Sequence, residues 1–171
     1  AEELAHDYLW RVHAHVPPRG EIGVFNRSHY EDVLIARVDE LVPRPVWQAR
    51  YRHINEFERM LAESNIQVVK IFLHISKAEQ RRRFEDRIHE PRKQWKFDPR
   101  DLDKRRQWPA YRLAFGDMLG RCNTRQARWY VVPADHKWLR DLAVSQIMYA
   151  VLSSLALRFP PPRFNPRLRV R

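Results

Sequence analysis

Apolar positions along the chain follow two periodicities, which alternate from one end to the other. Helical spacing marks seven segments, which begin near Leu4 and end near Ala150: 4–12, 29–37, 45–61, 76–88, a stretch from 98, 108–119 and 135–150. Continuous apolar runs predict three short strands, at 22–25, 68–75 and 129–132. Helices alternating with such strands are typical of a parallel sheet covered on both faces. We therefore expect a three-layer α/β/α fold.

Helix start signals support these boundaries. Ser76-Lys77-Ala78-Glu79 has the spacing of a capping box directly after the second strand. Pro45 is placed to start one helix, and Asp98 followed by Pro99 to start another. Asp135 is expected to cap the last helix.

The first predicted strand ends in a polar cluster, Asn26-Arg27-Ser28-His29-Tyr30-Glu31-Asp32. Ligands of open parallel sheets bind beyond the carboxyl ends of the strands, so this segment is a candidate active site. The alternative is a plain helix start with Asn26 or Ser28 as N-cap, in which Arg27 would have no role.

A second candidate is the basic segment from Arg81 to Lys96. Arg83 and Arg87 are four residues apart and share one helix face, and Lys93 and Lys96 follow in a loop after Pro91. Arginine guanidinium groups and lysine ammonium groups bind phosphate oxygens, and their positive charge balances the negative charge that develops during phosphoryl transfer. The alternative is a solvated helix face, which the neighbouring acids Glu85, Asp86 and Glu90 favour for Arg81 and Arg82.

Composition points to an anionic partner. The 171 residues, enough for one domain, carry a formal net charge of +11. Cys122 is the only cysteine, which excludes an intramolecular disulfide and favours a reducing compartment, for which we expect the cytoplasm. No apolar run approaches the about 20 residues that span a bilayer, so we expect no membrane partner. The tail 159–171, rich in Pro and Arg, is expected to be irregular.

Five segments together carry a resemblance to a known family: FNRSHYEDVL at 25–34, INEFERML at 54–61, KIFLHISKAEQRRRFEDRI at 70–88, EPRKQWKFDPRDL at 90–102 and WYVVPADHKW at 129–138. In these segments the sequence resembles the second family of polyphosphate kinases. The resemblance implies a P-loop kinase fold related to thymidylate kinase, with a basic helix and lid over 81–106. It also implies phosphate transfer between inorganic polyphosphate and AMP or ADP, giving ADP or ATP, with Mg²⁺.

The resemblance further implies roles for individual residues. It suggests catalytic roles for Arg27, Asp32 and Arg83. A wider set is expected to bind the phosphates of polyphosphate or nucleotide: Arg27, Arg37, Arg83, Arg87, Lys93, Lys96 and Arg112. The implied metal ligands are Asn26, Glu31 and Asp32; many members have Asp at the position of Asn26, so Glu31 or Asp32 is expected to supply the missing carboxylate. The alternative is that these two acids only face the dipole of a helix N-terminus.

One motif of that family is absent. None of the 4 glycines is followed by Lys, so the chain lacks a Walker A loop. We expect the intact protein to have a longer N-terminal part that carries it, and this chain alone to have little activity. We also expect a homo-oligomer. Two other functions stay open: a different P-loop kinase with a small-molecule acceptor, and a basic nucleic-acid-binding module, which the absence of a recognised nucleic-acid motif disfavours.

Overall fold

A computed structural model describes residues 5–164 of the chain. Helices α1, α2 and α3 precede the first strand, α4, α5 and α6 lie between the two strands, and α7 follows the second. The elements are α1 (Trp10–His13), α2 (Glu31–Val38), α3 (Arg44–Glu63), β1 (Lys70–His74), α4 (Lys77–His89), the 3-10 turn η2 (Gln94–Lys96), α5 (Arg100–Arg106), α6 (Trp108–Arg121), β2 (Trp129–Pro133) and α7 (Lys137–Ser154).

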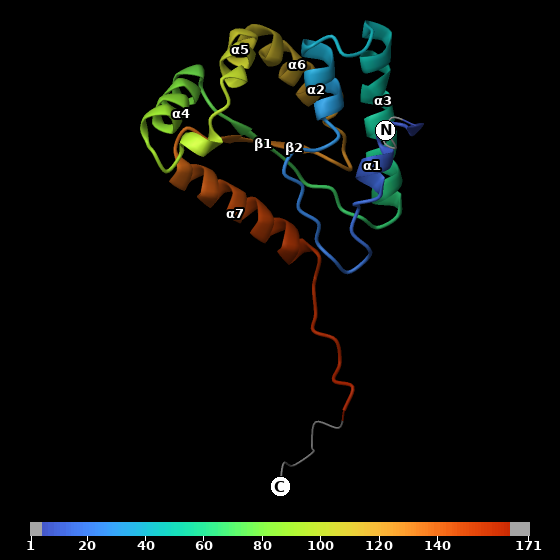
Figure 1. Ribbon diagram of the computed structural model, residues 1–171. Helices are drawn as coiled ribbons and strands as arrows, with labels where there is room; N and C mark the ends of the chain where they lie inside the picture. The colour runs from blue at the N-terminus through green and yellow to red at the C-terminus, as the bar shows by residue number, and fades with distance from the viewer. Residues whose placement is uncertain (1–4, 165–171) are drawn as a thin grey trace.

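The sheet is parallel, as the sequence predicts. β1 pairs with β2 in a register that runs from Lys70 opposite Trp129 to His74 opposite Pro133. In Figure 1, α2, α3 and α6 lie on one side of the two strands and α7 lies on the other, where it contacts β2. The α/β class with a parallel sheet between helices is therefore confirmed.

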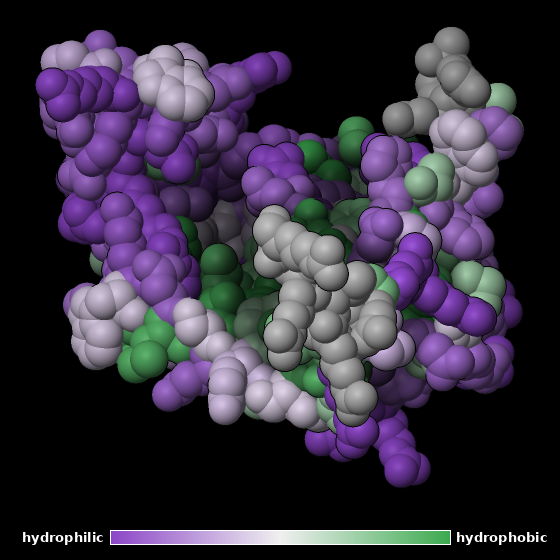
Figure 2. Space-filling view, turned by 90° about the horizontal axis from the view of Figure 1, so that it is seen from below, coloured by the Kyte–Doolittle hydropathy of each residue, from purple (hydrophilic) through white to green (hydrophobic). Residues whose placement is uncertain are grey.

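The predicted strand at 22–25 is wrong. Ile22 to Phe25 has no regular structure, and Ile22 and Val24 are 67% and 89% exposed. A strand exists only when its N–H and C=O groups pair with a neighbour, and the described part of the chain has no strand beside this segment. Other exposed apolar side chains lie on both strands and on α7. Figure 2 shows apolar side chains gathered across the middle of the face seen from below.

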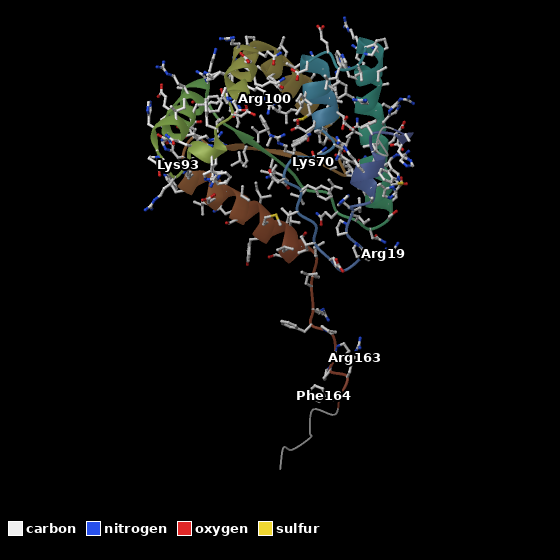
Figure 3. The ribbon with its side chains drawn as sticks, in the orientation of Figure 1. Arg19, Lys70, Lys93, Arg100, Arg163 and Phe164 are labelled. Carbon is white, nitrogen blue, oxygen red and sulfur yellow. The ribbon has the colours of Figure 1, made fainter. Side chains whose placement is uncertain are left out.

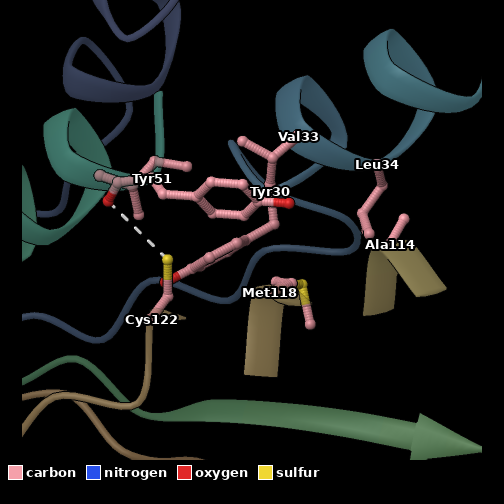
Figure 4. Close-up of a cluster of buried hydrophobic side chains, with 8 residues drawn as sticks. Tyr30, Val33, Leu34, Tyr51, Ala114, Met118 and Cys122 are labelled. Carbon is pink, nitrogen blue, oxygen red and sulfur yellow. Dashed lines mark hydrogen bonds between the residues drawn. The ribbon is translucent and has the colours of Figure 1, made fainter. Parts of the chain in front are cut away.

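The hydrophobic core lies between α2, α3 and α6. Burial of a large apolar side chain contributes about 1.5–3 kcal/mol, so this cluster is the main source of stability on this side of the sheet. Figure 4 shows most of its members, which are Tyr30, Val33, Leu34, Tyr51, Ile54, Ala114, Met118 and Cys122. The apolar face predicted on the long helix is confirmed, because Tyr51, Ile54, Phe57 and Leu61 are all buried there.

Most helix boundaries agree with the sequence signals. The Ser76 hydroxyl accepts a hydrogen bond from the Glu79 backbone N–H at 3.0 Å. This bond confirms that the Ser76 side chain caps α4. Pro45 lies in the first turn of α3. Asp98 accepts from the Arg100 N–H at 2.9 Å, although Pro99 is the residue that precedes α5.

The two ends of the chain are less regular. The first helix is shorter than its pattern predicts, and Leu4 lies outside the described residues, as does the tail from residue 165. From Phe159 to Phe164 the tail is exposed and irregular, as expected. Across residues 5–164, no helix combines the length and the apolar character needed to cross a membrane.

Cys122 is the fully buried residue that ends α6, where a half-buried helix position is expected from the sequence. Burial raises the pKa of its thiol to about 11. We expect an aromatic disulfide reagent at pH 8 to react with native protein at least roughly a hundredfold more slowly than with a thiol of ordinary pKa near 8.5. Protein unfolded in guanidinium is the control, and equal rates in both states would contradict the burial.

Candidate active site

The carboxyl ends of both strands meet at the start of α4. The Asp135 carboxylate, just after β2, accepts a hydrogen bond from the Ser76 N–H at 2.7 Å, and this bond lowers the pKa of Asp135. The prediction that Asp135 caps α7 is therefore wrong: His136 precedes that helix and makes no side-chain cap. Asp135 instead ties β2 to the N-terminus of α4, a contact that helical spacing alone does not predict.

The arginines of α4 are paired with acids of the same or a neighbouring helix. Arg83 donates to Glu79 at 2.7 Å and, across to the end of β2, to the Ala134 carbonyl at 2.6 Å. Hydrogen bonds from Arg82 and Arg83 lower the pKa of Glu79 to about 2. Arg87 has a looser partner, because its guanidinium lies 3.8 Å from Asp101 on α5. Exposed ion pairs of this kind contribute about 0–1 kcal/mol, so an anionic ligand can replace the acid.

The segment after α4 presents charge and one aromatic ring to solvent. Lys93 forms an ion pair with Glu90 and lies at the outer edge of the structure near α4 (Figure 3). Trp95 is 79% exposed, and the Lys96 ammonium lies 4.9 Å from the centre of its ring. Both lysines predicted to bind phosphate are therefore accessible beside the basic helix.

The Asn26–Ser28 turn leads into α2 through His29 and Tyr30. Arg27 has a φ of 67°, the left-handed conformation, which costs a residue other than glycine about 1–2 kcal/mol. Its side chain is exposed and, like that of Arg112 on α6, makes no hydrogen bond or ion pair with residues 5–164. Neither Asn26 nor Ser28 is the N-cap of α2, because Tyr30 holds that position.

Asp32, which the resemblance implies as a metal ligand, is paired with two arginines in this structure. Its carboxylate forms ion pairs with Arg11 at 3.2 Å and with Arg50 at 3.3 Å, and two guanidinium groups already balance its charge. Within the described ranges no three His, Cys, Asp or Glu side chains are arranged to hold a metal ion. Magnesium needs only one or two carboxylates beside waters and phosphate oxygens, so Asn26 and Glu31 as its ligands stay a prediction.

Arg37 is held inside the fold rather than presented to solvent. Its guanidinium donates to Asp117 on α6 at 2.6 Å and to the Tyr51 hydroxyl at 3.3 Å, and it stacks over the Trp47 ring. In this position Arg37 joins α2, α3 and α6, so a contact with substrate would require it to exchange Asp117 for a phosphate.

α5 connects α2 and α4, the helices next to the two candidate segments, a link that the sequence pattern did not predict. Lys104 forms an ion pair with Asp39 at the end of α2, and Arg105 donates to the Lys77 carbonyl at 2.7 Å at the start of α4. The charges of Glu31 and Arg27 both act on Tyr111, whose pKa burial raises. The segment after residue 25 and the basic helix therefore border one region.

A buried polar cluster is the largest feature that sequence reasoning missed. Lys70, Glu58 and Tyr30 come from β1, α3 and the residue before α2, and they are 5%, 0% and 3% exposed. Burial lowers the pKa of Lys70, and the Glu58 charge opposes that shift. The available signal was the Lys inside an otherwise apolar run at 68–75, since a charge on a buried strand requires a partner.

Comparison with known proteins agrees with this architecture. The model of the family described as Polyphosphate kinase 2 (PPK2) matches residues 1–158. The AMP/ADP-polyphosphate phosphotransferase of Meiothermus ruber is 53% identical over 94% of this chain and 60% of its own length. The ADP-polyphosphate phosphotransferase of Rhodopseudomonas palustris is 43% identical over 100% of this chain and 64% of its own.

A solved structure extends the agreement to three dimensions. The crystal structure of polyphosphate kinase 2 from Arthrobacter aurescens TC1 superposes with a TM-score of 0.92 and 41% identity, covering 96% of this chain and 58% of that one. The chain thus spans about three fifths of the length of these relatives. It belongs to the polyphosphate kinase 2 family.

Proposed function

We propose that the protein transfers phosphate from inorganic polyphosphate to AMP or ADP. The observation that carries this proposal is the row of cationic side chains on α4 and η2, directly beyond the carboxyl ends of β1 and β2. A polyphosphate chain is a linear polyanion, and a row of Arg and Lys matches its repeating charge. The names of the Meiothermus and Rhodopseudomonas relatives support the same reaction.

The proposal assigns tasks to this chain's own residues. Arg87, Lys93 and Lys96 would hold the phosphate chain, and their charges would balance the charge that develops on the transferred group. Arg83 would contribute from α4, where it also bonds the Ala134 carbonyl, and the exposed Arg27 and Arg112 would contribute from the turn before α2 and from α6. The segment with η2 would act as a lid in a P-loop kinase fold related to thymidylate kinase, and closure would exclude water as a competing acceptor.

In this proposal Mg²⁺ enters the site bound to the phosphates of the substrate. Such ions usually take one or two carboxylates, several waters and phosphate oxygens. Asp32 pairs with Arg11 and Arg50, and the tasks proposed for this chain's side chains do not depend on the ion. A cytoplasmic location and a homo-oligomeric state also stay predictions.

The test is an assay of the protein in its full natural length, with long-chain polyphosphate, Mg²⁺ and either AMP or ADP. We expect chromatography to show ADP from AMP, or ATP from ADP, only when polyphosphate is present. A parallel reaction without polyphosphate identifies a nucleotide kinase of another type, which would form ATP and AMP from ADP alone. A folded protein that forms no product in either reaction would refute the proposal, and a chelator arm tests the metal.

A further inference from the structure

The buried cluster of Glu58, Lys70 and Tyr30 forms a closed set of hydrogen bonds. The Lys70 ammonium donates to Glu58 at 2.7 Å, to the Tyr30 hydroxyl at 2.8 Å and to the Cys122 carbonyl at 2.6 Å. The Tyr30 hydroxyl donates in turn to the other Glu58 oxygen at 2.7 Å. All three N–H donors of the lysine are therefore used, and both carboxylate oxygens accept.

The cluster joins elements that are distant in sequence. Lys70 begins β1, Glu58 lies on α3, and Cys122 ends α6. Figure 3 shows Lys70 in the centre of the fold, well away from Lys93 at the outer edge. Lys70 is also close to the rings of Tyr30 and Trp129, each centred 5.1 Å from its ammonium. These contacts place a closed set of buried hydrogen bonds next to the start of α2; this set is called the polar junction below.

Tyr30 is the link from that junction to the candidate active site. Its backbone N–H donates to the Ser28 hydroxyl at 3.4 Å, and the next N–H, of Glu31, donates to the Ser28 carbonyl at 3.0 Å. The neighbouring His29 is also buried, with its ring at 4.7 Å from that of Tyr30 and its Nε2 atom 3.4 Å from Glu58. Two consecutive buried side chains therefore hold the turn that contains Arg27.

The turn needs such support. Arg27 is in the left-handed conformation, which persists only where the surroundings over-determine it. The segment before it, 22–25, is exposed and irregular, so it gives the turn no ladder of hydrogen bonds. The restraint on Arg27 comes from the C-terminal side, through His29 and Tyr30.

We infer that the Glu58–Lys70 pair is a buried anchor which, through Tyr30, positions the Asn26–Ser28 turn for phosphate binding. Glu58, Lys70 and Tyr30 touch no substrate in this scheme and are positioning residues. The inference rests on the proposed function for its purpose, whereas the anchoring of the turn stands on the contacts above.

The test uses Tyr30→Phe in the protein at its full natural length. This change removes only a hydroxyl, so the ring stays in the core and the direct Glu58–Lys70 contact stays possible. We expect hydrogen exchange of the backbone amides over 30–34, which are bonded to Ser28, His29 and Tyr30, to accelerate about tenfold or more while exchange in the core of α3 is unchanged. We also expect kcat to fall about tenfold with a smaller change in the KM for nucleotide.

The matched control is Tyr51→Phe, which removes a hydroxyl from the same core but leaves Glu58 and Lys70 untouched. It is expected to keep wild-type exchange over 30–34. Wild-type exchange in Tyr30→Phe would overturn the anchor, and faster exchange with unchanged kcat would overturn its role in the reaction. If the wild-type protein transfers no phosphate, the proposed function fails, and the exchange comparison still decides the anchoring of the turn.

Discussion

Replacing Lys70 with Met is expected to lower the free energy of unfolding by about 3–5 kcal/mol, since the change leaves the Glu58 carboxylate buried without its cation. Glu58 is 0% exposed and Lys70 is 5% exposed, so water cannot take the place of the lost partner. The Cys122 carbonyl and the Tyr30 hydroxyl lose a donor at the same time. Urea unfolding of the full natural protein, followed by tryptophan fluorescence, measures the effect.

Two further variants make this prediction specific. Glu58→Leu combined with Lys70→Met removes both charges, and we expect the double variant to be more stable than Lys70→Met alone. Arg59→Met breaks an exposed ion pair with Glu63 at 3.4 Å on the same helix as Glu58, and should cost only about 0–1 kcal/mol. A Lys70→Met variant no less stable than Arg59→Met would show that the buried pair does not hold the fold together.

The second large effect is expected in the kinetics of Arg87→Ala. Arg87 lies on the helix that follows β1, and its loose ion pair with Asp101 at 3.8 Å leaves its guanidinium available to a phosphate. Loss of one charge-stabilising contact should lower kcat/KM for polyphosphate by roughly ten- to a thousandfold. Stability should change by less than about 0.5 kcal/mol, because the side chain is not part of the core.

Arg81→Ala is the matched control for Arg87→Ala. Arg81 lies on the same helix, is more exposed and pairs with Glu85 at 2.7 Å. Its removal should leave kcat/KM within about twofold of the wild-type value. Arg83→Ala is a less clean probe, because it also breaks the bond to the Ala134 carbonyl at the end of β2. Equal kinetics in Arg81→Ala and Arg87→Ala would mean that the arginines of α4 are only a solvated helix face.

The sequence predicted which segments form the candidate site, but it did not predict which side chains contact one another there. The segments at 26–32 and 81–96 lie on or beside α2 and α4, and α5 joins these two helices through Lys104 and Arg105. The sequence pattern did not show that Asp32 faces two arginines or that Arg37 faces Asp117. Partners of these side chains lie on other elements, so spacing along one helix carries no information about them.

The sequence by itself determined the helices, the two paired strands and the start of α4. These features depend on residues within a few positions of one another, such as Ser76 and Glu79, or on the apolar face of α3. Only the tertiary structure decided that 22–25 stays unpaired, that Asp135 binds Ser76 and that Lys70 is buried against Glu58 and Tyr30. The physical reason is that pairing and burial depend on groups brought together by folding: Lys70 and Tyr30 are 40 residues apart, and Asp135 and Ser76 are 59 apart.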